Sequence, residues 1–295
     1  MPPLPFYIVD VFAEAKYAGN QLAVFTDAGS LSTEAMQRIA KEVNYSETTF
    51  ILSPEPRQDG YDVRIFTPNK ELPFAGHPTL GTAFVLQQTV IQQPIVTIAL
   101  NLKIGQIPVT IAYQNELPDV LWMQQQAPVF GETFAAPAMA AVLGLDDDDI
   151  DLNFPIQAVS TGIPFIIVPL KSQAALRRIR VNRDRYFAFV ETTDAKEILV
   201  FCPETYQAEN HLSVRVFAES LGIPEDPATG SANGCLAGYL VHHAYLGQPT
   251  VDVRVEQGHE IGRPSLLRLK AAPTANEIQV NVGGRVIMVA RGEFI

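Results

Sequence analysis

The sequence predicts an α+β protein made of two similar halves, and three observations carry this prediction. A chain of 295 residues corresponds to two domains, or to one large unit built from two halves, at about 150 residues per domain. Strand-like runs also outnumber helical stretches in both halves, and a short sequence of the first half recurs in the second.

The first half is rich in strand-like runs of β-branched and aromatic residues, bounded by Gly, Pro, Asn or Asp turns. Two stretches are helical instead: residues 32–42, where Ser32 can cap the first turn, and residues 78–88, which Pro78 opens. The predicted strands are residues 7–12, 22–25, 48–52, 61–66, 95–100, 107–113 and 120–124.

The second half follows the same plan, with many short strands and one long helix expected at about residues 231–244. The predicted strands are residues 156–159, 165–169, 186–190, 198–202, 212–217, 251–256, 266–270, 277–282 and 285–291.

An internal repeat connects the two halves. Val63-Arg64-Ile65-Phe66 and Val214-Arg215-Val216-Phe217 are nearly identical and lie 151 residues apart. The same offset places Ala75 on Asp226, and a Gly- and Pro-rich loop followed by a helix comes next in both halves. Such self-similarity indicates a duplicated architecture. We expect the two helix N-termini to meet at a cleft, where their unpaired N–H groups would bind a small anionic substrate.

Composition excludes several classes of function. Lys plus Arg number 21 and Asp plus Glu number 32, which gives a net charge of −11. A surface this acidic repels phosphate backbones, so nucleic acid is not an expected partner. The apolar stretch 163–170 is far shorter than the roughly 20 residues of a membrane span, and the start Met1-Pro2-Pro3-Leu4-Pro5 lacks the features of a secretion signal. We therefore predict a cytoplasmic protein with no membrane partner.

Three titratable residues are candidates for catalysis. His77 lies at the start of a predicted helix, whose positive dipole end favours the neutral imidazole, a donor or proton shuttle. Asp226 precedes the helix of the second half. Glu47 lies between a helix and an apolar strand, where burial would raise its pKa toward that of a general acid/base.

Each of these residues also has a purely structural interpretation. His77 could satisfy backbone groups of a turn, Asp226 could be a helix cap, and Glu47 could be an exposed residue at a strand start. Gly19-Asn20 is first a turn signal, although its amides could also bind a substrate. The sequence contains no nucleotide-binding loop and no Cys/His metal spacing, so we expect neither a cofactor nor a metal.

Several motifs in order resemble one known family. They are Gly19-Asn20, Ser46-Glu47-Thr48, Phe66-Thr67-Pro68, Gly76-His77-Pro78-Thr79 and Asp226-Pro227-Ala228-Thr229-Gly230-Ser231. With these motifs the chain resembles the phenazine-biosynthesis PhzF-like isomerase family over essentially its whole length. The resemblance implies a diaminopimelate-epimerase-like fold, in which each of two pseudo-symmetric domains wraps a β-barrel-like sheet around a central helix. We expect one domain from residues 1–125 with 283–295 and the other from residues 126–282.

The resemblance also implies a reaction, the cofactor-independent isomerisation of trans-2,3-dihydro-3-hydroxyanthranilate by a homodimer. Glu47 would remove a proton from one ring carbon and return it to another, while His77 and Asp226 would orient polar groups and assist proton transfer. The residues expected to bind the small carboxylated substrate are Asn20, Gly76, Gly230 and Ser231.

Two alternatives stay open from the sequence. One is an epimerase or racemase of an amino or hydroxy acid that uses Glu47 and Asp226 as opposed acid and base. The other is a binding protein for small acids without catalysis. A racemase with two thiols is disfavoured, because Cys202 falls on a predicted strand and Cys235 inside a predicted helix.

Overall fold

The computed structural model describes residues 3–295 and divides into two compact units. Unit 1 contains the residues up to Met123 together with Gly283–Ile295, and unit 2 is Gln124–Val282. Met1 and Pro2, which contributed to the argument about a secretion signal, lie outside the described residues. Within the described part of the chain, no helix has both the length and the apolar character that a membrane span requires.

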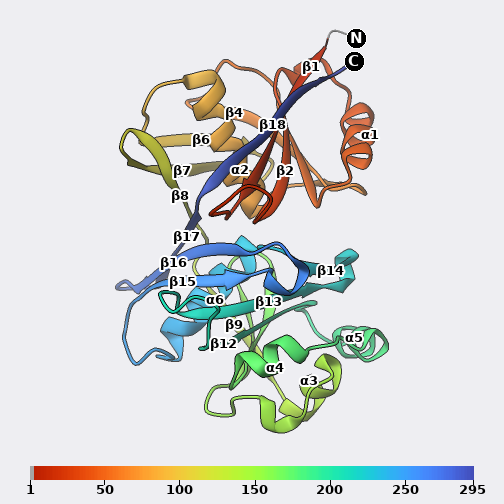
Figure 1. Ribbon diagram of the computed structural model, residues 1–295, viewed down its shortest axis with the longest axis vertical. Helices are drawn as coiled ribbons and strands as arrows, with labels where there is room; N and C mark the ends of the chain where they lie inside the picture. Colours follow the sequence, from red (N-terminus) through yellow and green to blue (C-terminus); the bar gives the residue numbers. More distant parts are fainter. Residues whose placement is uncertain (1–2) are drawn as a thin grey trace. The chain divides into compact units, whose positions relative to one another are not determined.

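Unit 1 is a sheet of neighbouring strands in the order β18-β1-β2-β3-β4-β6-β7-β8 (Figure 1). Only the pairs β2/β3 and β4/β6 in this series are parallel, and the short β5 pairs with β4. The elements are β1 (Leu4–Val11), β2 (Asn20–Phe25), α1 (Thr33–Val43), β3 (Glu47–Ile51), β4 (Tyr61–Phe66), β5 (Glu71–Leu72), α2 (Gly76–Leu86), β6 (Thr97–Leu102), β7 (Gly105–Gln114), β8 (Leu117–Gln124) and β18 (Val286–Phe294).

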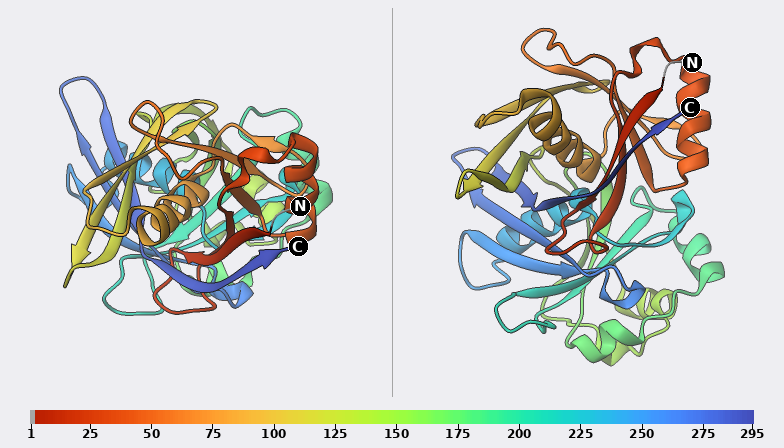
Figure 2. Two further views of the ribbon diagram at one scale, coloured as in Figure 1. Left: turned by 90° about the horizontal axis from the view of Figure 1, so that it is seen from above. Right: turned by 45° about the horizontal axis from the view of Figure 1, so that its top comes forward.

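Helix α2 is the central helix of unit 1. All its residues are buried, and it packs against β1, β2, β3, β6, β7 and β18 (Figure 2). Its sequence is uncharged on every face, which is typical of a helix enclosed on all sides. Gly81 permits the close approach, because a Cβ there would lie 2.6 Å from Leu22 Cδ2. The sheet of unit 1 therefore wraps around one apolar helix.

Unit 2 has the strand order β9-β10-β11-β12-β13-β15-β16, with β14 on β13 and parallel pairs β11/β12 and β13/β15. Its central helix α6 packs against β10, β11, β12, β15 and β16. The elements are β9 (Val129–Phe134), α3 (Ala136–Leu143), β10 (Ile156–Ser160), β11 (Pro164–Pro169), α4 (Gln173–Arg178), α5 (Arg183–Val190), β12 (Glu197–Cys202), β13 (Leu212–Ala218), β14 (Ile223–Asp226), α6 (Gly230–His242), β15 (Val251–Gln257), β16 (Ser265–Pro273) and β17 (Ile278–Gly284).

The two units have the same topology, which confirms the predicted fold class. Strands β1 to β4 correspond to β10 to β13, β5 to β14, α2 to α6, and β6 and β7 to β15 and β16. The recurring sequence lies on the equivalent strands β4 and β13. Each unit is thus a sheet wrapped around a central helix.

The offset of 151 residues is wrong beyond these strands. Ile65 pairs with Leu72, whereas its equivalent Val216 pairs with Asp226. Asp226 therefore corresponds to Leu72, not to Ala75 as the sequence predicts. The reason is a longer turn after β13, which contains the 3-10 helix Glu219–Leu221.

From that turn onward the offset is 154 residues. The first residues of the central helices, Gly76 and Gly230, are equivalent. With this offset, the segments that lead into the two helices align position by position and share a proline and a glycine. These segments are Leu72-Pro73-Phe74-Ala75-Gly76-His77 and Asp226-Pro227-Ala228-Thr229-Gly230-Ser231.

One predicted strand is a helix. Residues 186–190 belong to α5, whose N-cap Asn182 accepts a hydrogen bond from the backbone of Arg185 at 3.1 Å. Tyr186 and Val190 are its buried residues, four positions apart on one helical face. The aromatic and β-branched residues that suggested a strand are the inner face of a short surface helix.

Candidate active site

The N-terminus of α2 carries the first group of candidate residues. Gly76 and His77 are the first two residues of α2, and the N-cap Ala75 has no side-chain acceptor for the first-turn N–H groups. Thr79 Oγ1 donates to the Ala75 carbonyl oxygen at 2.8 Å and so does not cap those groups. First-turn N–H groups that no N-cap side chain satisfies can bind anions, so this end of α2 suits a carboxylate.

Glu47 and His77 meet at this helix end. Glu47 is the first residue of β3, and its Oε2 lies 3.4 Å from His77 Nε2. His77 is 6% exposed, and the Glu47 side chain is 14% exposed. The pair is thus largely enclosed within unit 1.

His77 is neutral at physiological pH. Burial lowers the pKa of His77 to about 3, and a hydrogen bond with the backbone of Gln21 acts in the opposite direction. A backbone bond raises the pKa of histidine when a ring N–H donates to a carbonyl, because this stabilises the imidazolium. Since Nε2 has no hydrogen-bond partner within residues 3–295, Nδ1 makes this bond. Nε2 is then an acceptor that faces Glu47.

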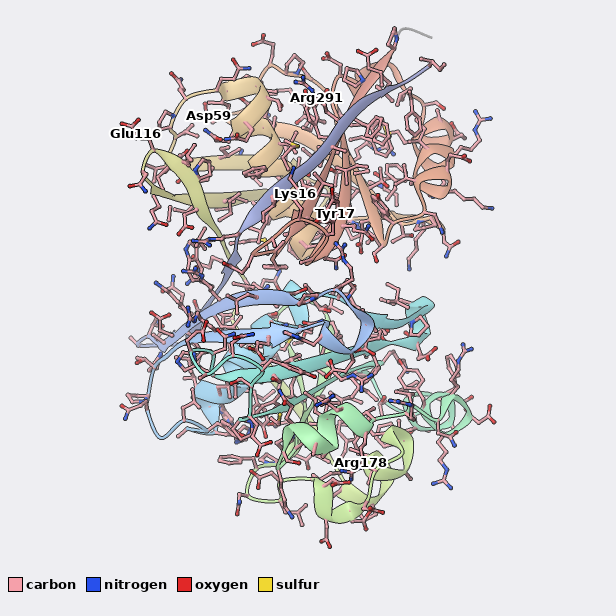
Figure 3. All side chains as sticks on the ribbon, in the orientation of Figure 1. Lys16, Tyr17, Asp59, Glu116, Arg178 and Arg291 are labelled. Atoms are coloured by element: carbon pink, nitrogen blue, oxygen red, sulfur yellow. The ribbon has the colours of Figure 1, made fainter. Side chains whose placement is uncertain are left out.

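Asn20 lies on the strand next to Glu47. It is the first residue of β2, is 2% exposed, and precedes Leu22, which pairs with Glu47 across β2 and β3. Gly19 has a φ of +68°, and a Cβ there would lie 2.3 Å from the Val11 carbonyl oxygen, so the turn requires glycine. Tyr17, 72% exposed, projects from the same turn (Figure 3).

In unit 2 the candidate residues surround the start of α6. Asp226 is the last residue of β14 and is 7% exposed. The hydroxyl of Thr229, the N-cap residue of α6, is hydrogen-bonded to Asp226 Oδ2 and does not cap the helix. Gly230 is buried at the first helical position, and Ser231, half-buried, follows it. The N-cap side chain therefore makes no capping hydrogen bond at the start of α6, as at the start of α2.

Sequence reasoning missed one residue of this group. Gln257 lies at the end of β15, 1% exposed, and its side chain contacts Asp226, Thr229 and Asn233. It belongs to no motif and is 31 residues from Asp226 along the chain. No local pattern in the sequence could have revealed it.

The two cysteines are placed as the sequence predicts, on β12 and inside α6. Both are fully buried, and burial raises the pKa of Cys202 to about 12 and that of Cys235 to about 11. A thiol must be deprotonated to act as a base or nucleophile. These environments disfavour thiol catalysis.

The structure thus groups Asn20, Glu47, Gly76 and His77 within unit 1, and Asp226, Gly230 and Ser231 within unit 2. A surface depression of about 600 Å³ in unit 1 lies elsewhere, around Tyr7, Glu55 and Thr89, and includes none of them. Among residues 3–295, no cluster of three or more His, Cys, Asp or Glu is arranged to hold a metal ion.

Comparisons with known proteins identify the family and the fold of the chain. The PhzC-PhzF family model, described as phenazine biosynthesis-like protein, matches residues 9–292. A trans-2,3-dihydro-3-hydroxyanthranilate isomerase of Pseudomonas aeruginosa is 37% identical over 97% of this chain and 98% of its own length. A PhzF-family phenazine biosynthesis protein of Bacillus anthracis has a TM-score of 0.92 at 28% identity, with 100% of both chains covered. A probable proline racemase of Agrobacterium radiobacter, 10% identical over 99% of this chain and 93% of its own, shares the fold with a TM-score of 0.64.

Proposed function

The chain belongs to the phenazine biosynthesis-like protein family and is an isomerase, and from this premise we propose that it moves a proton between two carbons of a small carboxylated substrate. The proposed substrate is trans-2,3-dihydro-3-hydroxyanthranilate, on which the Pseudomonas aeruginosa relative acts by name. The contact between Glu47 and neutral His77 at the start of α2 is the observation that carries the proposal.

Glu47 is the proposed base. Its carboxylate removes a proton from one carbon of the substrate and returns it to another. Between these two steps Glu47 carries the proton, and its carboxyl O–H can donate a hydrogen bond to His77 Nε2, 3.4 Å away, because this nitrogen of the neutral ring is an acceptor. His77 thereby stabilises the protonated base without having to become charged itself.

The remaining candidate residues bind and orient the substrate in this proposal. Backbone N–H groups of Gly76 and Gly230, the Ser231 hydroxyl and Asn20 hold the carboxylate, and the uncapped starts of α2 and α6 support this role. Asp226 orients a polar group of the substrate.

The first test follows the reaction by NMR in deuterated water. Wild-type protein should isomerise trans-2,3-dihydro-3-hydroxyanthranilate, and Glu47→Gln should lower kcat by at least roughly 100-fold, as expected when an acid/base group is lost. Glu42→Gln is the matched control, because it removes the same charge from an exposed position at the end of α1.

Other outcomes would contradict the proposal. If the Glu47→Gln variant keeps full activity, Glu47 is not the base. If wild-type protein leaves this substrate unchanged, deuterium exchange into a panel of amino and hydroxy acids tests the epimerase alternative. If no exchange occurs there either, the binding-protein alternative is favoured.

We also propose that the protein is a cytoplasmic homodimer. Buried, unpaired Cys202 and Cys235 fit a reducing compartment, and two-fold assemblies are the commonest oligomers. Sedimentation velocity of the purified chain tests the dimer, and a monomer at micromolar concentration would contradict it.

A further inference from the structure

The side chain of Gln257 makes four hydrogen bonds to a single segment. Its Nε2 donates to the Asp226 carbonyl oxygen at 2.8 Å and to Thr229 Oγ1 at 3.1 Å. Its Oε1 accepts from the Thr229 backbone N–H at 3.2 Å and from Asn233 Nδ2 at 2.9 Å. Because a backbone carbonyl can only accept and a backbone N–H can only donate, the orientation of this amide is fixed. Gln257 thus ties the end of β14 to the first turn of α6.

This orientation also fixes the Thr229 hydroxyl. Since Gln257 Nε2 donates to Thr229 Oγ1, the hydroxyl proton is free for the short contact with Asp226 Oδ2. Asp226 is then the acceptor of that bond, and its carboxylate is held at a set position and rotation. Gln257 therefore holds Asp226 in two ways. Its amide bonds directly to the Asp226 main-chain carbonyl, and it orients the Thr229 hydroxyl that donates to the Asp226 carboxylate.

The duplication provides an internal comparison for this network. In the parallel pair β13/β15, Leu212 lies opposite Val255, and Gln257 follows two residues after Val255. In the equivalent pair β4/β6, Tyr61 takes the place of Leu212 and lies opposite Leu100, so Leu100 corresponds to Val255. Gln257 thus corresponds to Leu102 of unit 1. The unit 1 equivalents of Asp226, Thr229 and Gln257 are Leu72, Ala75 and Leu102, which all lack a polar side chain.

A neighbouring contact is kept in both units and so serves as a reference. Asn233 Nδ2 donates to the Thr229 carbonyl oxygen at 3.0 Å, and the equivalent Thr79 Oγ1 donates to that of Ala75 at 2.8 Å. This bond belongs to the shared architecture of a central helix start. The hydrogen bonds of Gln257, in contrast, occur only in the unit that carries Asp226. The shared fold therefore does not require them.

We propose that Gln257 is a positioning residue for Asp226, which it aligns for the substrate through Thr229 and the main chain. The inference rests on the proposed role of Asp226 in the reaction. Gln257 itself is buried behind the segment that it holds and is not assigned a contact with substrate.

Gln257→Met tests the inference, because methionine fills a similar volume but offers no comparable donor. The expected result is a fall in kcat of roughly 10- to 100-fold, the usual effect of slightly misplaced reacting groups, with KM changed by less. In an Asp226→Asn background, Gln257→Met should lower kcat only slightly further, since the effects of residues that act as one unit are not additive. A merely structural role would give equal effects in both backgrounds. If Gln257→Met does not fold, Gln257→Glu is tested in its place. This variant keeps the size of the side chain and the acceptor for the Thr229 N–H and Asn233 Nδ2.

Glu256→Gln is the matched control on the same strand. Glu256 is 2% exposed and accepts hydrogen bonds from the backbones of Tyr206 and Gln207 at 2.7 and 2.9 Å. Its unit 1 equivalent Asn101 likewise binds a loop, at the Arg57 carbonyl oxygen. Glu256→Gln should therefore lower the thermal midpoint about as much as Gln257→Met and leave kcat near wild type. Equal kcat in the two variants would overturn the inference.

Hydrogen exchange separates this inference from the proposed function. If wild-type protein does not turn over the proposed substrate, the proposed function fails, and the Thr229 amide then becomes the readout. Its exchange should be at least tenfold faster in Gln257→Met than in Glu256→Gln, because it loses the Gln257 acceptor. Equal exchange rates would show that Gln257 does not hold this segment and would overturn the inference independently.

Discussion

At the scale of single residues, His77 makes the stability of unit 1 depend on pH. Its pKa is about 3 in the folded protein, against an ordinary value of 6.5. The unfolded chain therefore binds a proton that the folded chain excludes, and the stabilising contribution, complete above pH 6.5, is lost as the pH falls toward 3. At pH 5 the loss from this group amounts to about 2 kcal/mol, at 1.36 kcal/mol for each pH unit below 6.5.

The measurement is urea unfolding of wild type and His77→Gln at pH 7.5 and pH 5. Wild type should lose about 2 kcal/mol more than the variant on acidification. His211→Gln is the control, because His211 is exposed, and it should behave as wild type does. Equal losses in wild type and His77→Gln would show that His77 takes up a proton in the folded state.

The residue scale also shows how far the sequence could predict the candidate site. Glu47, His77 and Asp226 lie at the starts or ends of apolar elements, so local patterns single them out. The tautomer of His77 depends on Gln21, and the position of Asp226 depends on Gln257. These partners come from other strands, and their proximity is a result of folding that no spacing in the sequence encodes.

At the scale of secondary structure, the duplicated strands β4 and β13 each carry the same arginine fork. Arg64 Nε and Nη2 each donate to Glu71 at 2.8 Å, and Arg215 donates to Glu225 at 2.9 and 2.6 Å. Each fork anchors a short strand, β5 or β14, that leads to a central helix. The copies differ in burial, because the arginine side chain is 23% exposed in unit 1 and 6% exposed in unit 2.

This difference predicts unequal costs for the same substitution. Arg215→Met leaves Glu225 largely buried without its partner and should destabilise the protein by about 3–5 kcal/mol. Arg64→Met should cost about 1 kcal/mol, since Glu71 keeps its contact with Lys103 at 2.7 Å. Chemical unfolding of both variants gives the comparison. Adding Glu225→Met to Arg215→Met should recover most of the loss, and a failure to recover it would mean that packing dominates.

The elements themselves could be predicted where their pattern is long. Helix α1 begins after Ser32, which accepts from the Ala35 backbone at 3.2 Å as expected from its capping position. A five-residue window could not distinguish α5 from a strand, because the buried face of α5 consists of Tyr186 and Val190 alone. The change of the repeat offset from 151 to 154 residues could not be predicted either, since it arises in a turn that has no sequence similarity between the two units.

At the scale of the whole molecule, the chain follows one topology twice and then adds a last strand to unit 1. Strand β18 pairs antiparallel with β1 from Leu4 opposite Phe294 to Val11 opposite Val286 (Figure 1). The Phe294 ring contacts those of Phe6 and Phe25, with centroids 5.4 and 5.0 Å apart. Unit 1 therefore depends on packing between residues from opposite parts of the sequence.

Phe294→Ala should weaken unit 1 specifically, because each unit has its own hydrophobic core. We expect a loss of roughly 2 kcal/mol, below the 3–5 kcal/mol of a fully buried phenylalanine because Phe294 is only half-buried. Hydrogen exchange should become faster in β1 and β2 and stay unchanged in β12 and β13. Phe154→Ala is the opposite control, since its half-buried ring packs on Tyr245 in unit 2 at 4.5 Å. If both variants accelerate exchange throughout the chain, the two units unfold as a single cooperative body.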